Sequence, residues 1–156
     1  MTTPTIVLTL PATYGWVGIA AFATIALTGW QTIKVAGARK AAGIKYPQLY
    51  AETHQAEKSR SAHIFNCTQR AHANTMESQP GVLFSTFVAG LKYPRAAAAL
   101  CGIWTAARVV YTIGYCTGDP KKRSSGAAPA ALALLGLYGL TAYTLFDLVA
   151  QNNFKF

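Results

Sequence analysis

Charge is scarce in this chain of 156 residues, since only 12% of them are Asp, Glu, Lys or Arg, against about 25% in soluble globular proteins. Acidic residues are scarcer still, five against 14 Lys and Arg, which leaves a formal net charge of +9. This composition argues against a soluble enzyme with a charged surface. Intrinsic disorder is excluded as well, because 52% of the residues are hydrophobic and disordered chains are poor in such residues.

Cysteine and histidine are also few, with three of each. The cysteines are far apart and include no C-x-x-C pair, so neither a disulfide framework nor a zinc site is indicated. The histidines lack the spacing of metal ligands. We therefore expect no bound metal, and thiols buried on membrane helices. The residues concerned are Cys67, Cys101 and Cys116, and His54, His63 and His72.

Long apolar stretches separate the few charges. A helix needs about 20 apolar residues to cross a bilayer, and residues 14–33 and 127–146 each form such a stretch without a charge. The stretch 96–115 contains only Arg108, whereas 63–91 is weaker because polar residues crowd its start. The sequence predicts an all-α membrane protein of one domain over residues 1–156, with spans near 14–33, 63–91, 96–115 and 127–149.

Basic residues concentrate in two polar segments. Six lie between the first two spans, and three more, Lys121 to Arg123, lie between the last two. Lys and Arg in short loops mark the cytosolic side, so we expect both segments in the cytosol and both termini opposite. The same rule accounts for the net charge, and we predict no nucleic-acid partner. The six are Lys34, Arg39, Lys40, Lys45, Lys58 and Arg60, and the opposite side has Lys92, Arg95 and Lys155.

Polar residues occupy two helical faces at membrane depth. Both faces lie at the predicted cytosolic ends of their helices, where guanidinium, carboxylate, amide and phenol groups would meet. Ionisable groups at this depth mark either function or a buried pair. A pocket for a zwitterionic, peptide-like ligand and a packing network of Arg and Glu fit the spacing equally well. The faces consist of Arg70, Asn74 and Glu77, at i, i+4 and i+7, and of Arg108, Tyr111 and Tyr115, at i, i+3 and i+7.

Two tracts carry a resemblance to a known family. They are residues 65–77 and 108–124, and residues 45–50 and the Arg-Ser-x-Gly pattern at 123–126 fit with them. On these motifs the chain resembles the MAPEG family of membrane glutathione enzymes, and within it the branch of type three microsomal glutathione transferases. The resemblance extends over most of the chain, from the first span to the fourth.

This resemblance implies a left-handed bundle of four transmembrane helices that assembles as a homotrimer. It implies the endoplasmic reticulum membrane as the location, and the outer mitochondrial membrane stays an alternative because the sequence shows no address that a targeting receptor would read. Glutathione is then a co-substrate bound between protomers near the cytosolic side. The implied reaction joins glutathione to a lipophilic electrophile, or reduces a lipid hydroperoxide that arrives through the membrane lipid.

The resemblance also implies roles for individual residues. Arg123, after the third helix, would stabilise the glutathione thiolate, with Tyr115 beside it. Lys122 is an alternative, because the spacing from Tyr115 is one residue longer than in leukotriene C4 synthase. His72 and Ser78 replace a glutamine and a tyrosine of that enzyme, and His72 can still hydrogen-bond glutathione. The remaining expected contacts to glutathione are Arg70, Asn74, Glu77, Arg108, Tyr111 and, from the neighbouring protomer, Arg39.

The expected chemistry is activation of a thiol. A free thiol has a pKa near 8.5, so a nearby guanidinium is needed to favour the reactive thiolate at neutral pH. Two other interpretations stay open: a non-catalytic fatty-acid-binding protein like the family's lipoxygenase-activating member, and a structural membrane protein. The activating member lacks the sulfur-directed arginine, so Arg123 favours the enzyme.

Overall fold

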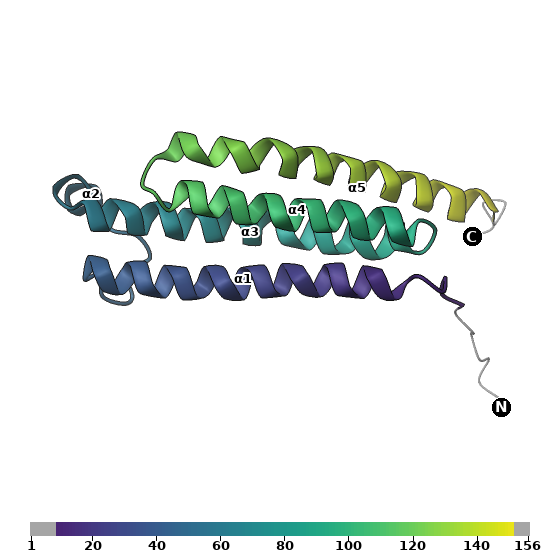
Figure 1. Cartoon of the computed structure of the whole chain (residues 1–156), viewed down its shortest axis with the longest axis horizontal. Coiled ribbons are helices and arrows are strands. Elements are labelled where there is room, and N and C mark those ends of the chain that lie inside the picture. The colour runs from purple at the N-terminus through teal and green to yellow at the C-terminus, as the bar shows by residue number, and fades with distance from the viewer. Residues whose placement is uncertain (1–8, 152–156) are drawn as a thin grey trace, which may run out of the picture.

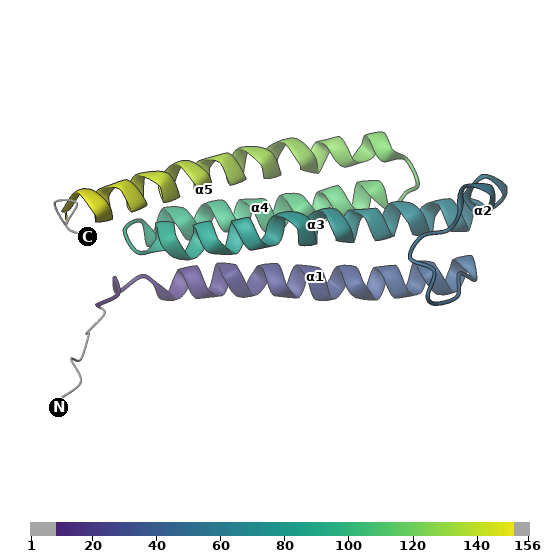
Figure 2. The ribbon, with the colours of Figure 1, turned by 180° about the vertical axis from the view of Figure 1, so that it is seen from behind.

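A computed structural model describes residues 9–151, which contain four long helices, one short helix and a 3-10 turn, with no strand in that range. Helices α3 and α4 form the centre of the bundle, with α1 on one side and α5 on the other (Figures 1 and 2). The elements are α1 (Gly15–Ala42), α2 (Thr53–Lys58), α3 (Arg60–Gly90), α4 (Pro94–Tyr115), the 3-10 helix η1 (Pro120–Arg123) and α5 (Ser124–Gln151).

Local sequence signals mark several helix ends. The Ser59 side chain accepts a hydrogen bond from the backbone N–H of Ala62 at the start of α3, as expected of an N-cap residue. Helix α4 begins at Pro94, where a missing N–H costs nothing. The Asp119 side chain accepts from the backbone N–H of Lys121 and opens η1.

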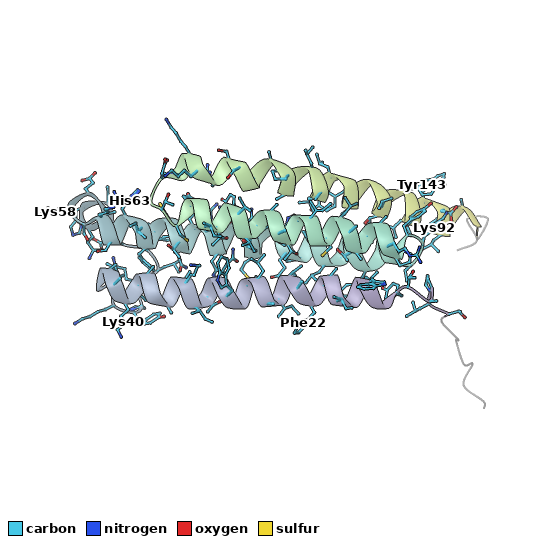
Figure 3. All side chains as sticks on the ribbon, viewed as in Figure 1. Phe22, Lys40, Lys58, His63, Lys92 and Tyr143 are labelled. Carbon is cyan, nitrogen blue, oxygen red and sulfur yellow. The ribbon has the colours of Figure 1, made fainter. Side chains whose placement is uncertain are left out.

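The bundle is apolar outside and partly polar inside. Phe22 on α1 is 69% exposed and Leu132 on α5 is 70% exposed, and Figure 3 shows Phe22 pointing away from the other helices. Buried threonines lie between the helices instead, and alanines surround Trp104 at the centre of the core. Small residues let membrane helices approach closely, so this distribution suits a bilayer rather than water.

Three helical stretches among the described residues are long and apolar enough to cross a membrane: α1, α4 and residues 120–150, which include all of α5 but its last residue. The predicted spans 14–33, 96–115 and 127–149 fall on them. The weaker span, 63–91, falls on α3, which is long enough but more polar. The prediction of an all-helical membrane protein is therefore confirmed for this part of the chain.

Basic residues lie at both ends of the bundle. Lys40 and Lys58 lie at the end where α3 begins, and Lys92 lies at the other end beside Tyr143 (Figure 3). Lys92 Nζ is 2.7 Å from the Asp147 carboxylate, and this hydrogen bond raises the pKa of Lys92. Lys155, one of the three basic residues predicted to lie on the side opposite the cytosol, lies outside the described residues.

Candidate functional site

The two polar faces, except for Tyr115, line one cavity of about 730 Å³ between α3, α4 and α5. Along α5 it extends from Ala127 to Tyr138, about 16 Å at 1.5 Å per residue. Its wall consists of Arg70, Asn74, Glu77 and Ser78 from α3, Trp104, Arg108 and Tyr111 from α4, Arg123 from η1, and Ala127, Ala130, Ala131, Leu134 and Tyr138 from α5.

The α3 wall is a pre-arranged pair of opposite charges. Arg70 Nη1 donates to Glu77 Oε1 at 2.7 Å, and Nη2 lies 3.5 Å from Oε2. Asn74 donates to the backbone carbonyl of Arg70 at 3.3 Å. The two charged side chains are 45% and 57% exposed, and an exposed pair contributes little to stability. A contribution to helix packing therefore does not explain the presence of the Arg70–Glu77 ion pair.

The α4 wall presents a buried guanidinium. Arg108 is only 7% exposed, and its Nε donates to Thr75 Oγ1 at 3.2 Å. Its guanidinium carbon lies 4.3 Å from the centre of the Tyr111 ring. Among the described residues, Arg108 Nη2 has no hydrogen-bond partner. A buried charge without an anion is costly, so this group is suited to an anionic ligand.

Arg123 reaches the cavity from η1 and is held by Tyr115. Its Nη1 donates to the Tyr115 hydroxyl at 3.3 Å, and its guanidinium lies 5.2 Å from the ring centre. The buried rings of Tyr111 and Tyr115 pack edge to face at 5.7 Å. Tyr115 itself stands behind the wall, so its contact with the cavity passes through Arg123.

Lys122 lies on a different surface. It lines a separate depression with Val110, Ile113 and Gly114 of α4. Lys122 and Arg123, which are adjacent in η1, therefore lie on different surfaces. Of these two residues, only Arg123 is part of the cavity wall.

The Arg-Ser-x-Gly pattern has a packing reason. A Cβ at Gly126 would collide with the backbone N of Tyr111 and the carbonyl O of Ala107, and one at Gly114 would collide with the carbonyl of Lys122. Both glycines let the start of α5 and the preceding turn lie directly on α4. This close approach sets Arg123 beside Tyr115.

Arg39 lies outside the cavity of its own protomer. Its Nη1 and Nη2 donate to the carbonyls of Gln48 and Leu49 at 2.6 and 3.3 Å. Its guanidinium also lies between the rings of Tyr46 and Phe65, 4.4 and 4.6 Å from their centres. Within one chain, Arg39 fastens the loop that follows α1.

Other motif residues divide between site and scaffold. His72 is half-buried on α3 but is not part of the cavity wall formed by the described residues. Ser78 does line it, although its hydroxyl donates to the backbone carbonyl of Asn74 at 3.0 Å. Asn66 is structural, because its side chain bonds both the N–H and the carbonyl of Ala51.

The sequence did not predict the apolar end of the cavity. Trp104, Leu134 and Tyr138 form part of it, and the Tyr138 hydroxyl packs against Gly81 of α3. Periodicity places residues on faces of one helix but does not say which helix faces them. An aromatic residue inside each apolar run was the only available signal.

The cysteines stay free and apart from the cavity wall. Cys67 and Cys101 are buried, as expected, whereas Cys116 follows the end of α4 and is only half-buried. Between residues 9 and 151, the structure holds no group of three or more His, Cys, Asp or Glu side chains placed to bind a metal.

A comparison with family models finds one match. The model described as "MAPEG family" matches residues 17–143. This range covers most of the chain and contains every residue of the cavity wall.

Proposed function

Because the chain belongs to the MAPEG family, we propose that it is a membrane enzyme that conjugates glutathione to lipophilic electrophiles or uses it to reduce lipid hydroperoxides. The family includes glutathione transferases and peroxidases. The observation that carries the proposal is the cavity, which combines three arginines and a carboxylate in one space of about 730 Å³. Glutathione matches this set, since it has two carboxylates, one ammonium group and a thiol.

Glutathione is held by exchange of existing contacts. The exposed Arg70–Glu77 pair opens, so that Arg70 binds a carboxylate of the peptide and Glu77 binds its ammonium group. Asn74 adds a hydrogen bond from the same face. The guanidinium of Arg108, which lines the cavity, takes the second carboxylate beside Tyr111, and a hydrogen bond between charged groups there is stronger than a neutral one.

Arg123 stabilises the thiolate. It reaches the cavity while Lys122 does not, and Arg keeps its charge in a less polar environment better than Lys does. The thiolate attacks an electrophilic carbon to form a C–S bond while the bond to the leaving group breaks, so that chlorodinitrobenzene releases chloride. With a hydroperoxide it attacks the distal oxygen, the O–O bond breaks, and an alkoxide leaves. A second glutathione converts the resulting sulfenic acid to glutathione disulfide and water.

The lipid acceptor enters from the bilayer and occupies the apolar end of the cavity near Trp104 and Leu134. We place the enzyme in the endoplasmic reticulum membrane as a homotrimer of the type three branch, with α3 as the fourth span and the basic segments in the cytosol. In the trimer, we expect Arg39 to exchange its hydrogen bonds to the carbonyls of Gln48 and Leu49 for a contact with glutathione in the neighbouring protomer.

A fatty-acid-binding protein without activity is the second candidate, and the apolar end of the cavity favours it. Fatty-acid binding alone does not explain why Arg123 lies beside Tyr115 in the cavity. A purely structural role gives no reason for a half-exposed Arg70–Glu77 pair.

Glutathione consumption by detergent-solubilised protein separates the three functions. We expect turnover with cumene hydroperoxide and with chlorodinitrobenzene, lost in Arg123→Ala and kept in Lys122→Ala. Fatty-acid binding without turnover would instead indicate the non-catalytic function. Absence of both would leave the structural role.

A further inference from the structure

A closed ring of hydrogen bonds lies behind Arg108. Gln31 of α1 donates through Nε2 to Thr75 Oγ1 on α3 at 2.9 Å and to Thr112 Oγ1 on α4 at 2.7 Å. Thr75 also accepts from Arg108 Nε at 3.2 Å, and Thr112 donates to the carbonyl of Arg108 at 2.7 Å. The ring therefore holds Arg108 by its side chain and by its backbone.

Burial makes this ring restrictive. Thr75 is 0% exposed, and Gln31 and Thr112 are each 1% exposed. The Thr75 hydroxyl donates to the carbonyl of Ala71 at 3.1 Å, and its two lone pairs accept from Gln31 and Arg108, which uses its full capacity. A buried polar group that loses its hydrogen-bond partner costs free energy. The Thr75 hydroxyl therefore has one favourable orientation, and its hydrogen bond with Arg108 Nε fixes the Arg108 side chain in turn.

We propose that Gln31 is a positioning residue for the cavity. From α1, outside the cavity wall, it fixes Thr75 and Thr112 and so holds the guanidinium of Arg108, a residue of the cavity wall whose buried Nη2 has no hydrogen-bond partner among the described residues. This positioning role follows from the hydrogen bonds of the ring and does not depend on the proposed function. Its consequence for glutathione affinity rests on the proposed function.

The chemistry of the ring requires an amide at position 31. Both hydroxyls give their protons to backbone carbonyls, so the residue between them must donate twice. The NH₂ group of Gln31 does so, whereas a carboxylate has no proton to give. Gln31→Glu, with an ionised side chain, therefore loses both donated hydrogen bonds, as Gln31→Leu does.

A matched control exists about one turn beyond Thr75 on α3 and about two turns before Gln31 on α1. Gln79 of α3 donates to Thr24 of α1 at 3.1 Å, so it also joins α1 to α3 and is 8% exposed. Among the described residues, Gln79 makes no hydrogen bond with Arg108. Gln79→Leu thus reproduces the loss of a buried α1–α3 hydrogen bond without touching the ring.

The first readout is solvent exchange of the Arg108 Nε–H, followed by NMR of the full-length protein in lipid nanodiscs. We expect Gln31→Leu and Thr75→Val to accelerate it at least about tenfold, since local opening governs such exchange. Gln79→Leu and Thr75→Ser, which keeps the hydroxyl, stay near the wild type. Gln31→Met gives the same test if Gln31→Leu fails to assemble. Unchanged exchange in the Gln31 variants overturns the proposal.

The second readout is the dissociation constant for glutathione, from calorimetry. Gln31→Leu is expected to raise it about threefold to tenfold, with no further effect in an Arg108→Gln background, because both changes remove one interaction. If the wild type binds no glutathione while Gln31→Leu still accelerates exchange, the proposed function fails and the positioning role stands. If the wild type binds glutathione but the Gln31 variants leave the Arg108 Nε–H exchange rate unchanged, the positioning role fails and the proposed function stands.

Discussion

Arg123 and Lys122 are adjacent in the sequence yet face different surfaces. The sequence left the choice between them open because it did not predict η1. Consecutive residues of a 3-10 helix point about 120° apart, so a one-residue change in spacing exchanges the side chain that reaches the cavity. Neighbouring basic residues cannot be assigned without that local geometry.

Removal of the Arg123 guanidinium tests its proposed role in thiol activation. A close opposite charge lowers a thiol pKa by roughly one to three units, so Arg123→Ala should raise the pKa of bound glutathione by that amount. Near neutral pH, each unit lowers the thiolate fraction about tenfold. The ultraviolet absorbance of the thiolate and the turnover should fall together and recover in part as the pH rises. Lys122→Ala is the control, and loss of the signal in that variant alone would transfer the role to Lys122.

Arg70→Ala tests the binding face of α3. We expect the dissociation constant for glutathione to rise at least tenfold, about 1.4 kcal/mol, because the variant lacks the expected carboxylate partner. The melting temperature of the assembled protein should change little, since the pair is half-exposed. Lower thermal stability with unchanged affinity would favour the packing network instead.

At the scale of elements, uncharged runs predicted the helices but not all their limits. The first span was expected to end near residue 33, whereas α1 continues to Ala42. Charged residues end a membrane span without ending a helix, and Ala, Lys and Arg in this segment are good helix formers. This extension of α1 places Arg39 next to the carbonyls of Gln48 and Leu49, to which its guanidinium donates hydrogen bonds.

Pairing between elements was the least predictable feature. The spacing of Arg70, Asn74 and Glu77 gave one helical face correctly, but α5 has no charge between residues 127 and 146 to mark its side of the cavity. Gln31 was equally hidden, because a single amide in an apolar helix gives no indication of its partners.

Gly126→Ala tests the contact between α4 and α5. The added Cβ would collide with the backbone of α4, and overpacking of this kind costs about 1–3 kcal/mol. Thermal unfolding in detergent should show the loss, and the thiolate signal should weaken because Arg123 moves away from Tyr115. Gly139→Ala on the same helix is the control, since a Cβ there meets nothing within 4 Å. Equal stability of the two variants would show that the close approach is dispensable.

At the scale of the whole molecule, the distribution of charge predicts the topology. The basic segments at 34–60 and 121–123 lie at one end of the bundle and Lys92 lies at the other (Figures 1 and 3). Protease added to sealed microsomes should therefore cut between residues 34 and 60 and spare a tag placed after Phe156. Removal of the tag with survival of the loop would mean that the topology is inverted.

The class of the whole molecule was predictable because a bilayer constrains composition strongly. Long uncharged runs sufficed for the all-helical membrane prediction, and the two motif tracts sufficed for the family. The cavity required three helices to be placed together, which no single-helix pattern specifies.

The most direct test of the account is a pH titration of glutathione bound to the assembled wild-type protein, followed by thiolate absorbance. If the cavity activates the thiol, the signal appears on mixing at neutral pH, with an apparent pKa at least about one unit below the value near 8.5 of a free thiol. A bound glutathione that titrates near 8.5, or no binding at all, would contradict the central claim that this protein is a glutathione-activating enzyme.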